Sequence, residues 1–451
     1  MKNTKIILSV LLALVMVFGV VSLVACNPNK GGNKPIELVL WTPSGAQEFY
    51  KEWANNWANG YVDAKGVEHE GFKDAEGHTY KVSLGVFEED GVKDILINSP
   101  TDGADVFLFV DDHMADMIDN NLLALVGDTT REGTVAYDVA HRNSESSVEA
   151  ASYNGELRAY PMQADNTYFL FYNSTILSDE DVLTWDGIFD RLAEVNQGKT
   201  GNDRVTVQLD YGVSWYQAAW FFTYGGKADA SNFGDPDVAY KALQAAYEFS
   251  SQPDFKSQSA SLALPEGLID GSIAAGIAGT WICVDELKNL IDDGTIKLTI
   301  LPKIRLSTDP KEDENSYVQM KAFLGCKLIG VNAQGPYVTA SHYLANFLTS
   351  EEVQIAKALA LGAGPSNKVA ASLPEVLALP TVQVVAQQAL YSVPQAMFPA
   401  AGFTAVSAPI NAVDGSTPTT SSAYFGADGK CIAEKVDPML TAMMNTIFPK
   451  A

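Results

Sequence analysis

The stretch YKVSLGVFEEDGVKDILINSPTDGADVFLFVDDHMADMIDN, residues 80–120, contains the pattern that decides the fold of this chain. It holds two successive units, each a β-rich run followed by an amphipathic helical stretch. The β-rich runs cover residues 80–87 and 104–110, and the helical stretches cover 92–98 and 113–120. Strands that alternate with helices form mainly parallel sheets with helices packed on their faces. The stretch therefore predicts an α/β fold.

The same alternation continues on both sides of this stretch. Before it, ELVLW at 37–41 precedes a helical stretch at 46–57, and the polar residues 60–78 are typical of a surface hairpin or loop. After it, residues 153–173 form two extended runs around a polar centre, and Thr184 is a suitable N-cap for a helix to about residue 197. Further strands are predicted at 205–209, 273–277, 297–300 and 327–331, and further helices at 215–224, 236–250, 284–291, 338–347, 351–361, 381–391 and 434–447.

The N-terminus has the pattern of a lipoprotein signal peptide. Lys2 and Lys5 precede an apolar run at 6–24, which ends in LVAC with Cys26. A basic start, an apolar middle and small residues before a cysteine predict cleavage after residue 25 and a lipid on the Cys26 thiol. The alternative is a single transmembrane anchor, because residues 6–25 approach the length that spans a bilayer. Residues 26–35 are polar and rich in Gly and Pro, and they predict a flexible linker.

Composition limits both the architecture and the partners. The remaining chain of about 415 residues exceeds the length at which a single core stops growing, so two lobes are expected. The whole chain has 55 acidic and 30 basic residues, a formal net charge of −25, and no basic cluster outside the signal region. Nucleic acid and anionic lipid are therefore not expected as partners. The acidic surface itself suits the solubility of an exported protein.

Cysteine and histidine spacing offers no metal site. After Cys26, three cysteines remain at long spacings, so at most one disulfide can form among Cys283, Cys326 and Cys431. The five histidines have no metal-binding spacing, and the sequence contains no phosphate-binding loop or dinucleotide fingerprint. We expect no metal and no cofactor, and any nucleotide hydrolysis must belong to a partner.

Several segments, in this order, resemble the family 1 extracellular solute-binding proteins of ABC importers. They are the opening strand with Trp41, GADVFLF followed by two aspartates, YNGELRAYP followed by a strand ending in FYN, the pair Thr184 and Trp185, DGSIAAGIAGTW at 270–281, and AFLGCKLIGVNA at 322–333 followed by FLTSEEVQ. The resemblance implies a two-lobe, periplasmic-binding-protein-like fold of type II. Each lobe is expected to be a mixed, mostly parallel sheet flanked by helices, and three hinge crossings should join the lobes.

The resemblance also implies lobe boundaries and a function. Lobe 1 is expected at 36–163 plus 325–372 and lobe 2 at 164–324 plus 373–451, with crossings near 163–167, 323–327 and 369–378. The implied function is capture of a sugar or oligosaccharide between the lobes by a lipid-anchored, extracytoplasmic, monomeric protein that is not an enzyme. The implied partners are two permease subunits and a cytoplasmic ATPase.

Aromatic side chains near strand ends are the predicted platforms for sugar rings. Ligands of α/β sheets bind at the carboxyl ends of the strands. Trp281, Trp215 and Phe109 match aromatic positions of the family. Tyr216 is the neighbour of Trp215, and Phe403, after Pro399 and Gly402, is expected to supply a further platform from the helical tail. The alternative for Trp281 is a core tryptophan that closes its lobe. Trp220 and Phe221 are expected in the core.

Polar residues beside these platforms are the predicted hydrogen-bonding groups. Asp165, with Asn166 beside it, matches an acid placed between the lobes, and Asp112 matches a carboxylate that binds sugar hydroxyls, with Asp111 next to it. The alternative for both aspartates is capping of the following helix. Ser44 and Gln47 flank the first strand-to-helix turn. His113 replaces a basic residue of the family and Gly45 and Ala46 replace a charged pair, which argues against assuming the same sugar.

Other functions remain open on the sequence alone. A polyamine would suit an acidic, aromatic site, whereas phosphate or ferric ion lacks the expected donors or ligands. A surface glycosidase would need two carboxylates at a defined separation. An inert adhesin would bind no small ligand.

Overall fold

The structure, a computed structural model, describes residues 34–227, 231–257, 263–283, 285–395 and 398–449. Residues Ile36–Ala451 form one compact unit. The predicted signal peptide at 1–25, Cys26 and all but the last two residues of the predicted linker lie outside the described residues. Among the helices that the structure describes, none is long and apolar enough to cross a membrane.

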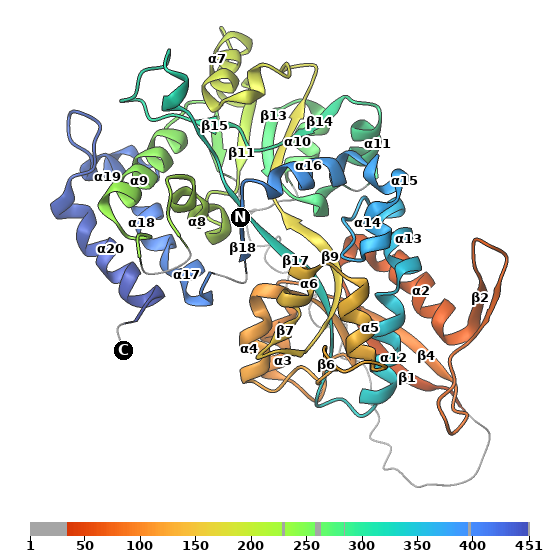
Figure 1. The fold of residues 1–451 in the computed structure, drawn as a ribbon. Helices are drawn as coiled ribbons and strands as arrows, with labels where there is room; N and C mark the ends of the chain where they lie inside the picture. Colours follow the sequence, from red (N-terminus) through yellow and green to blue (C-terminus); the bar gives the residue numbers. More distant parts are fainter. Residues whose placement is uncertain (1–33, 228–230, 258–262, 284, 396–397, 450–451) are drawn as a thin grey trace, which may run out of the picture. The chain divides into compact units, whose positions relative to one another are not determined.

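The first large sheet contains the two strands predicted within residues 80–120 (Figure 1). Its strand order is β18-β17-β5-β1-β4, and β9 pairs with β17 off this path. β1 is parallel to β4 and β5, and β17 is parallel to β18 but antiparallel to β5 and β9. The strands are β1 (Ile36–Thr42), β4 (Tyr80–Val86), β5 (Val106–Val110), β9 (Tyr160–Thr167), β17 (Ala322–Val331) and β18 (Ser392–Pro394).

The second large sheet has the order β12-β11-β13-β10-β14. Its strands are β10 (Phe169–Asn173), β11 (Thr206–Leu209), β12 (Phe255–Ser257), β13 (Ile273–Ala278) and β14 (Ile296–Thr299). Parallel pairings join β11 to β12 and β13, and antiparallel pairings join β10 to β13 and β14. The second sheet is therefore mixed in equal parts, whereas parallel pairings predominate in the first.

Small hairpins and meanders complete the strand list. β2 (Gly60–Val62) and β3 (Glu68–Glu70) form the hairpin predicted within 60–78. The others are β6 (Gly127–Asp128), β7 (Ser152–Tyr153), β8 (Glu156–Leu157), β15 (Lys303–Ile304) and β16 (Val318–Gln319).

Helices occupy most of the remaining chain. Before β9 they are α2 (Gln47–Asn59), α3 (Val92–Asn98), α4 (Met114–Asp119), α5 (Val135–Arg142) and α6 (Glu145–Ala150). Between β10 and β17 they are α7 (Trp185–Val195), α8 (Ser214–Thr223), α9 (Pro236–Ser250), α10 (Ala263–Asp270) and α11 (Asp285–Asp292). After β17 they are α12 (Val338–Leu348), α13 (Glu351–Leu361), α14 (Lys368–Ser372), α15 (Pro374–Leu377), α16 (Pro380–Ala389), α17 (Ala400–Ala405), α18 (Ser407–Ala412), α19 (Pro418–Ser421) and α20 (Ala433–Ile447).

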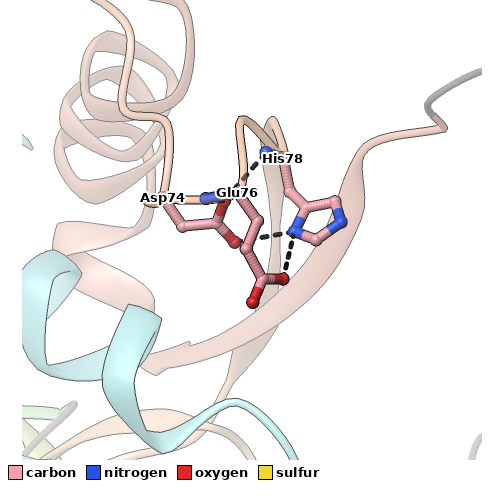
Figure 2. A group of neighbouring side chains, drawn as sticks. All are labelled: Asp74, Glu76 and His78. Carbon is pink, nitrogen blue, oxygen red and sulfur yellow. Dashed lines mark hydrogen bonds and ion pairs between the residues drawn. The ribbon is translucent and has the colours of Figure 1, made fainter.

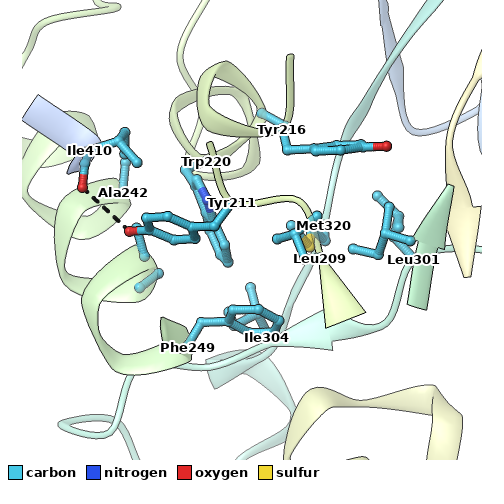
Figure 3. Close-up of a cluster of buried hydrophobic side chains, with 14 of the residues drawn as sticks. Leu209, Tyr211, Tyr216, Trp220, Ala242, Phe249, Leu301, Ile304, Met320 and Ile410 are labelled. Carbon is cyan, nitrogen blue, oxygen red and sulfur yellow. Dashed lines mark hydrogen bonds between the residues drawn. The ribbon is translucent and has the colours of Figure 1, made fainter. Parts of the chain in front are cut away.

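Each large sheet has its own hydrophobic core. The core of the first sheet draws its buried residues from 38–162 and 326–353. Two clusters on the second sheet draw theirs from 168–323 and 384–447. Figure 3 shows part of one of these, in which Trp220 lies among Leu209, Phe249 and Ile304. The prediction that Trp220 belongs to the core is confirmed, since only 1% of it is exposed.

The segments that join the two cores lie side by side. β9 and β17 are antiparallel, with Asn166 opposite Gly325 and Gln163 opposite Lys327. Two of the three predicted crossings therefore pair with each other through backbone hydrogen bonds (Figure 1). The third predicted segment, 369–378, falls within α14 and α15.

Candidate functional site

Asp165 on β9 connects three distant segments of the chain. Its Oδ2 accepts hydrogen bonds from the backbone amide of Gly364 at 2.6 Å and from the Thr280 hydroxyl at 3.2 Å. Its Oδ1 accepts from Gln163 Nε2 at 3.0 Å. Asp165 is fully buried, so these donors replace the water that a carboxylate would otherwise require. They fix the carboxylate between β9, the loop after α13 and the short helix η5 (Thr280–Ile282).

A buried ion pair lies next to this carboxylate. Lys327 Nζ on β17 is 3.3 Å from Glu89 Oε1, and both residues are more than nine-tenths buried. The same ammonium lies 6.0 Å from the centroid of the Trp281 ring, within cation–π range. Burial alone would lower the pKa of Lys327, but Glu89 and then Asp165 outweigh it and raise that pKa. Lys327 is therefore a fixed positive charge beside an aromatic face.

A second buried lysine lies behind the first. Lys357 Nζ on α13 is 2.7 Å from the Tyr50 hydroxyl and also donates to Gln163 Oε1. Burial, reinforced by the charge of Lys327, lowers the pKa of Lys357 to about 7. Gln163 thus links this lysine to Asp165.

Two adjacent aspartates, Asp111 and Asp112, follow β5. Oδ1 of Asp111 and Oδ1 of Asp112 are buried and accept no hydrogen bond from any described residue. Burial raises the pKa of Asp111 well above its usual value, and the charge of Asp112 raises it further. Burial also raises the pKa of Asp112, against the opposing effect of His113. Neither aspartate caps α4, because the residue at its N-cap position, His113, makes no capping hydrogen bond and the N-cap of the preceding turn is Val110.

The aspartates approach the crossing strands at a glycine. A Cβ on Gly325 would lie within 2.7 Å of both Asp111 Oδ1 and Gln395 Oε1. Gln395 Oε1 also accepts a 3.3 Å hydrogen bond from Asn166 Nδ2, the side chain opposite Gly325 in the sheet. Gln395 is fully buried, and its side chain lowers the pKa of the Asp112 carboxyl. Asp111, Asn166 and Gln395 therefore converge on one face of β17.

The predicted aromatic platforms differ in exposure. Trp281 and Trp215 are partly exposed, and each packs against the edge of a core. Tyr216, Phe109 and Phe403 are at least nine-tenths buried, and Phe109 is fully covered within the first core. The ring centroids of Phe403 and Phe323 are 5.2 Å apart. In this conformation only the two tryptophans offer ring surface to a ligand.

Ser44 and Gln47 lie at the first strand-to-helix turn, as predicted. Ser44 is exposed, and its backbone amide donates to Glu88 Oε1 at 3.0 Å. Gln47 is partly exposed and begins α2. Among the described residues, no hydrogen bond or ion pair joins either side chain to Asp165 or Trp281, so their role stays a prediction.

Four residues of this cluster were not predicted as site residues: Glu89, Lys327, Lys357 and Gln395. Lys327 carries a signal that was available in the sequence, because it is the one charged residue in the apolar run AFLGCKLIGV. A charged residue in a buried strand requires a partner. Glu89 and Gln395 lie in connecting segments, where the sequence pattern gives no such signal.

One group of possible metal ligands lies elsewhere, in the loop before β4. Figure 2 shows Asp74, Glu76 and His78 facing one another. Both oxygens of Asp74 already accept hydrogen bonds from the Glu76 and His78 amides, the His78 ring and the Tyr80 hydroxyl. Burial would raise the pKa of Asp74, but these hydrogen bonds lower it to about 2. The contacts identify a hydrogen-bonded turn, and we assign it no metal.

Two surface hollows lie on the second sheet and its helices. One of about 480 Å³ is lined by residues that include Tyr172, Leu183 and Lys297, and one of about 440 Å³ by residues that include Phe189 and Arg204. Neither contains a predicted site residue. The three cysteines predicted to allow one disulfide, Cys283, Cys326 and Cys431, are all free.

Comparison with protein families gives one match. Residues 72–384 match the profile described as bacterial extracellular solute-binding protein, which covers more than half of the 451 residues. A comparison with curated proteins finds no match.

Solved structures resemble the chain over nearly its whole length. A protein solved with acarbose is 24% identical, with 92% of this chain and 99% of that chain covered and a TM-score of 0.68. The ligand-free maltodextrin binding protein MalE1 from L. casei BL23 is 20% identical, with 91% and 100% covered and a TM-score of 0.64. The maltose-maltodextrin binding protein of the thermoacidophilic bacterium Alicyclobacillus acidocaldarius is 18% identical, with 90% and 99% covered and a TM-score of 0.66. These likenesses confirm the predicted fold class.

Proposed function

Because this chain belongs to the bacterial extracellular solute-binding proteins, we propose that it captures a sugar or oligosaccharide in a cleft between two lobes. The family acts outside the cytoplasm and consists of binding proteins rather than enzymes. The solved relatives named above include maltodextrin- and maltose-binding proteins, which supports the sugar class.

The observation that carries the proposal is the position of Trp281. Trp281 comes directly after Thr280, whose hydroxyl donates a hydrogen bond to Asp165. Its partly exposed ring has the Lys327 ammonium 6.0 Å from the ring centroid. A sugar has apolar C–H faces and a rim of hydroxyls, so it requires a flat ring beside charged hydrogen-bonding groups. Stacking and charged hydrogen bonds of this kind are together sufficient for micromolar affinity, about −8 kcal/mol.

The proposed lobes are 36–163 plus 325–372, and 164–324 plus 373–451. The buried residues change from the first core to the second between 162 and 168, and back to the first between 323 and 326. These two changes support the boundaries. β9 and β17, which connect the cores, serve as two crossings in this proposal, and α14 with α15 contains the third. A ligand that contacts both lobes favours the closed form, because it shifts the equilibrium by its differential affinity for the two states.

The protein is proposed to act as a monomeric lipoprotein of an ABC importer. Cleavage after residue 25 would leave Cys26 to carry the lipid, and residues 26–35 would tether the compact unit to the membrane. Permease subunits with a cytoplasmic ATPase would then receive the ligand on closure. The ATPase is required because the sequence has no phosphate-binding loop.

Thermal unfolding tests the ligand class. Residues 36–451, the compact unit, are unfolded with a panel of mono- and oligosaccharides and with spermidine. A ligand that binds only the folded state raises the melting temperature by mass action. A saturable rise with one sugar class supports the proposal. A rise with spermidine alone indicates a polyamine receptor, and no rise with any compound contradicts a solute receptor of either kind.

A further inference from the structure

We propose that the ligand carries a protonated amine, which the carboxylates of Asp111 and Asp112 bind beside Gly325. This inference rests on the proposed function and specifies its ligand as an amino sugar rather than a neutral one. The chemistry that the site recognises is an ammonium group that donates hydrogen bonds to two carboxylates.

The first observation is that one oxygen of each carboxylate is buried without a hydrogen-bond partner. Asp111 is only 4% exposed, and its Oδ1 has no hydrogen-bond partner in the described part of the chain. Oδ1 of Asp112 is buried and unpartnered in the same way. A buried carboxylate oxygen without a hydrogen bond is costly, so most such atoms in folded proteins are paired with a donor.

The second observation is that the Gln395 side chain brings another acceptor close to Asp111 at Gly325. Asp111 Oδ1 and Gln395 Oε1 both lie within 2.7 Å of the position of a Cβ on Gly325. The donor to Gln395 Oε1 is Asn166 Nδ2 at 3.3 Å, which is long for a hydrogen bond. An ammonium group has three N–H donors and no acceptor, so it complements a cluster of acceptors better than a hydroxyl does.

The third observation is the balance of charge around the site. Lys327 pairs with Glu89, and the two buried lysines, Lys327 and Lys357, interact with the two buried acids Glu89 and Asp165. Lys93, the lysine that acts on Asp112, already forms a 2.8 Å ion pair with Asp116. Within the described ranges, no ion pair within 4.0 Å involves Asp111 or Asp112. His113, the other group whose charge acts on Asp112, has its pKa lowered by burial. Asp111 and Asp112 therefore have no direct counter-charge among the described residues.

A ligand ammonium would supply that charge. Charge-assisted hydrogen bonds are stronger than neutral ones, and their strength increases in a water-excluded site. A neutral sugar would leave both carboxylates without a counter-charge. The site should therefore prefer an amino sugar to its N-acetylated form by at least about tenfold in Kd.

Calorimetric titration of residues 36–451 tests the inference, with three ligands of matched length: a glucosamine oligomer, its N-acetylated form and maltotetraose. Spermidine distinguishes a sugar amine from a polyamine. The variants are Asp111→Asn and Asp112→Asn, and the control is Asp119→Asn, an exposed acid at the end of α4 that changes the net charge equally. We expect the glucosamine oligomer to bind most tightly, and we expect its advantage to be lost in both aspartate variants and retained in the control.

The comparison of ligands on the unaltered chain needs no variant, so a folding defect in Asp111→Asn leaves the test intact. Neutral sugars that bind as tightly as the amine would overturn the inference while the sugar-binding function stands. Tight binding of spermidine without any sugar would support ammonium recognition and overturn the sugar. Absence of binding by all four compounds would overturn both.

Discussion

The backbone amide of Gly364 donates a 2.6 Å hydrogen bond to the carboxylate of Asp165, which lies 199 residues earlier in the chain. A Cβ on Gly364 would stand 2.8 Å from Asp165 Cβ, so only glycine allows this approach without displacement. The contact fixes a buried negative charge where β9 leaves the first core, beside the predicted ligand contacts Asn166 and Trp281.

Replacement of Asp165 by asparagine should destabilise the protein. The NH₂ group of the asparagine would face an N–H donor of Gly364 or Gln163, so at least one of these hydrogen bonds would be lost. We expect the free energy of unfolding to fall by about 2 to 4 kcal/mol. Urea denaturation measures this loss, with Asp119→Asn as the exposed control, which should change stability by less than about 0.5 kcal/mol. An equal effect of both substitutions would show that the Asp165 contacts contribute little.

The pair of Lys327 and Glu89 should behave as a coupled unit. Loss of one partner leaves the other charge buried, so Lys327→Met and Glu89→Gln should each cost about 3 to 5 kcal/mol of unfolding free energy. The double variant should be less destabilised than the sum of the two. A double-mutant cycle by chemical denaturation gives this coupling, and additive losses would show that the two charges act independently.

Lys357 should make stability depend on pH. Its pKa is about 7 in the folded protein and about 10.4 in an unfolded chain, so between these values the unfolded chain binds more protons. Stability should therefore rise with pH across this window, by at most about 1.4 kcal/mol per pH unit, and Lys357→Met should abolish this contribution. Urea denaturation at pH 7, 8 and 9 measures both proteins.

The comparison with Lys357→Met is necessary because other groups make stability change with pH in the opposite direction. Burial raises the pKa of the Cys283 and Cys326 thiols, so their contribution to stability falls as pH rises above their unfolded values. Both proteins retain these thiols, so the difference between the two curves isolates Lys357. Parallel curves would contradict the assignment.

Cys26 should determine where the protein resides. With cysteine at this position the chain is expected in the membrane fraction, because two or three acyl chains hold a protein firmly to a bilayer. Cys26→Ser should release it or leave an uncleaved precursor, as judged by fractionation and by the mass of the N-terminal peptide. Retention of Cys26→Ser in the membrane with the peptide uncut would favour the transmembrane alternative.

Periodicity in the sequence predicted much of the fold. The helices at 236–250 and 351–361 coincide with α9 and α13, and Thr184 accepts the predicted capping hydrogen bond from the Gly187 amide at 3.0 Å. Strong apolar periodicity and suitable caps explain this agreement. By contrast, α17 (AAGFTA) and α18 (SAPINA) were not predicted, because small residues, Gly402 and Pro409 obscure any amphipathic pattern.

The site was less predictable than the fold, since a sequence does not reveal which polar groups will be buried together. Asp165, Asn166 and Trp281 could be selected by resemblance, but Gln395 joins them only through a contact across 229 residues. Phe109 lies on a strand that is buried throughout, so its position at the strand end did not make its ring accessible. Lys327 could have been found by asking why a charged residue interrupts an apolar strand.

The most direct test of the central claim is a calorimetric titration of residues 36–451 with the sugar that gives the largest thermal stabilisation, repeated with Trp281→Ala. The control is Tyr343→Ala, a half-exposed aromatic on α12. We predict one binding site, and a Kd that is weakened by about ten- to a hundredfold in Trp281→Ala and unchanged in Tyr343→Ala. Equal affinity of the unaltered chain and Trp281→Ala would contradict the proposed cleft.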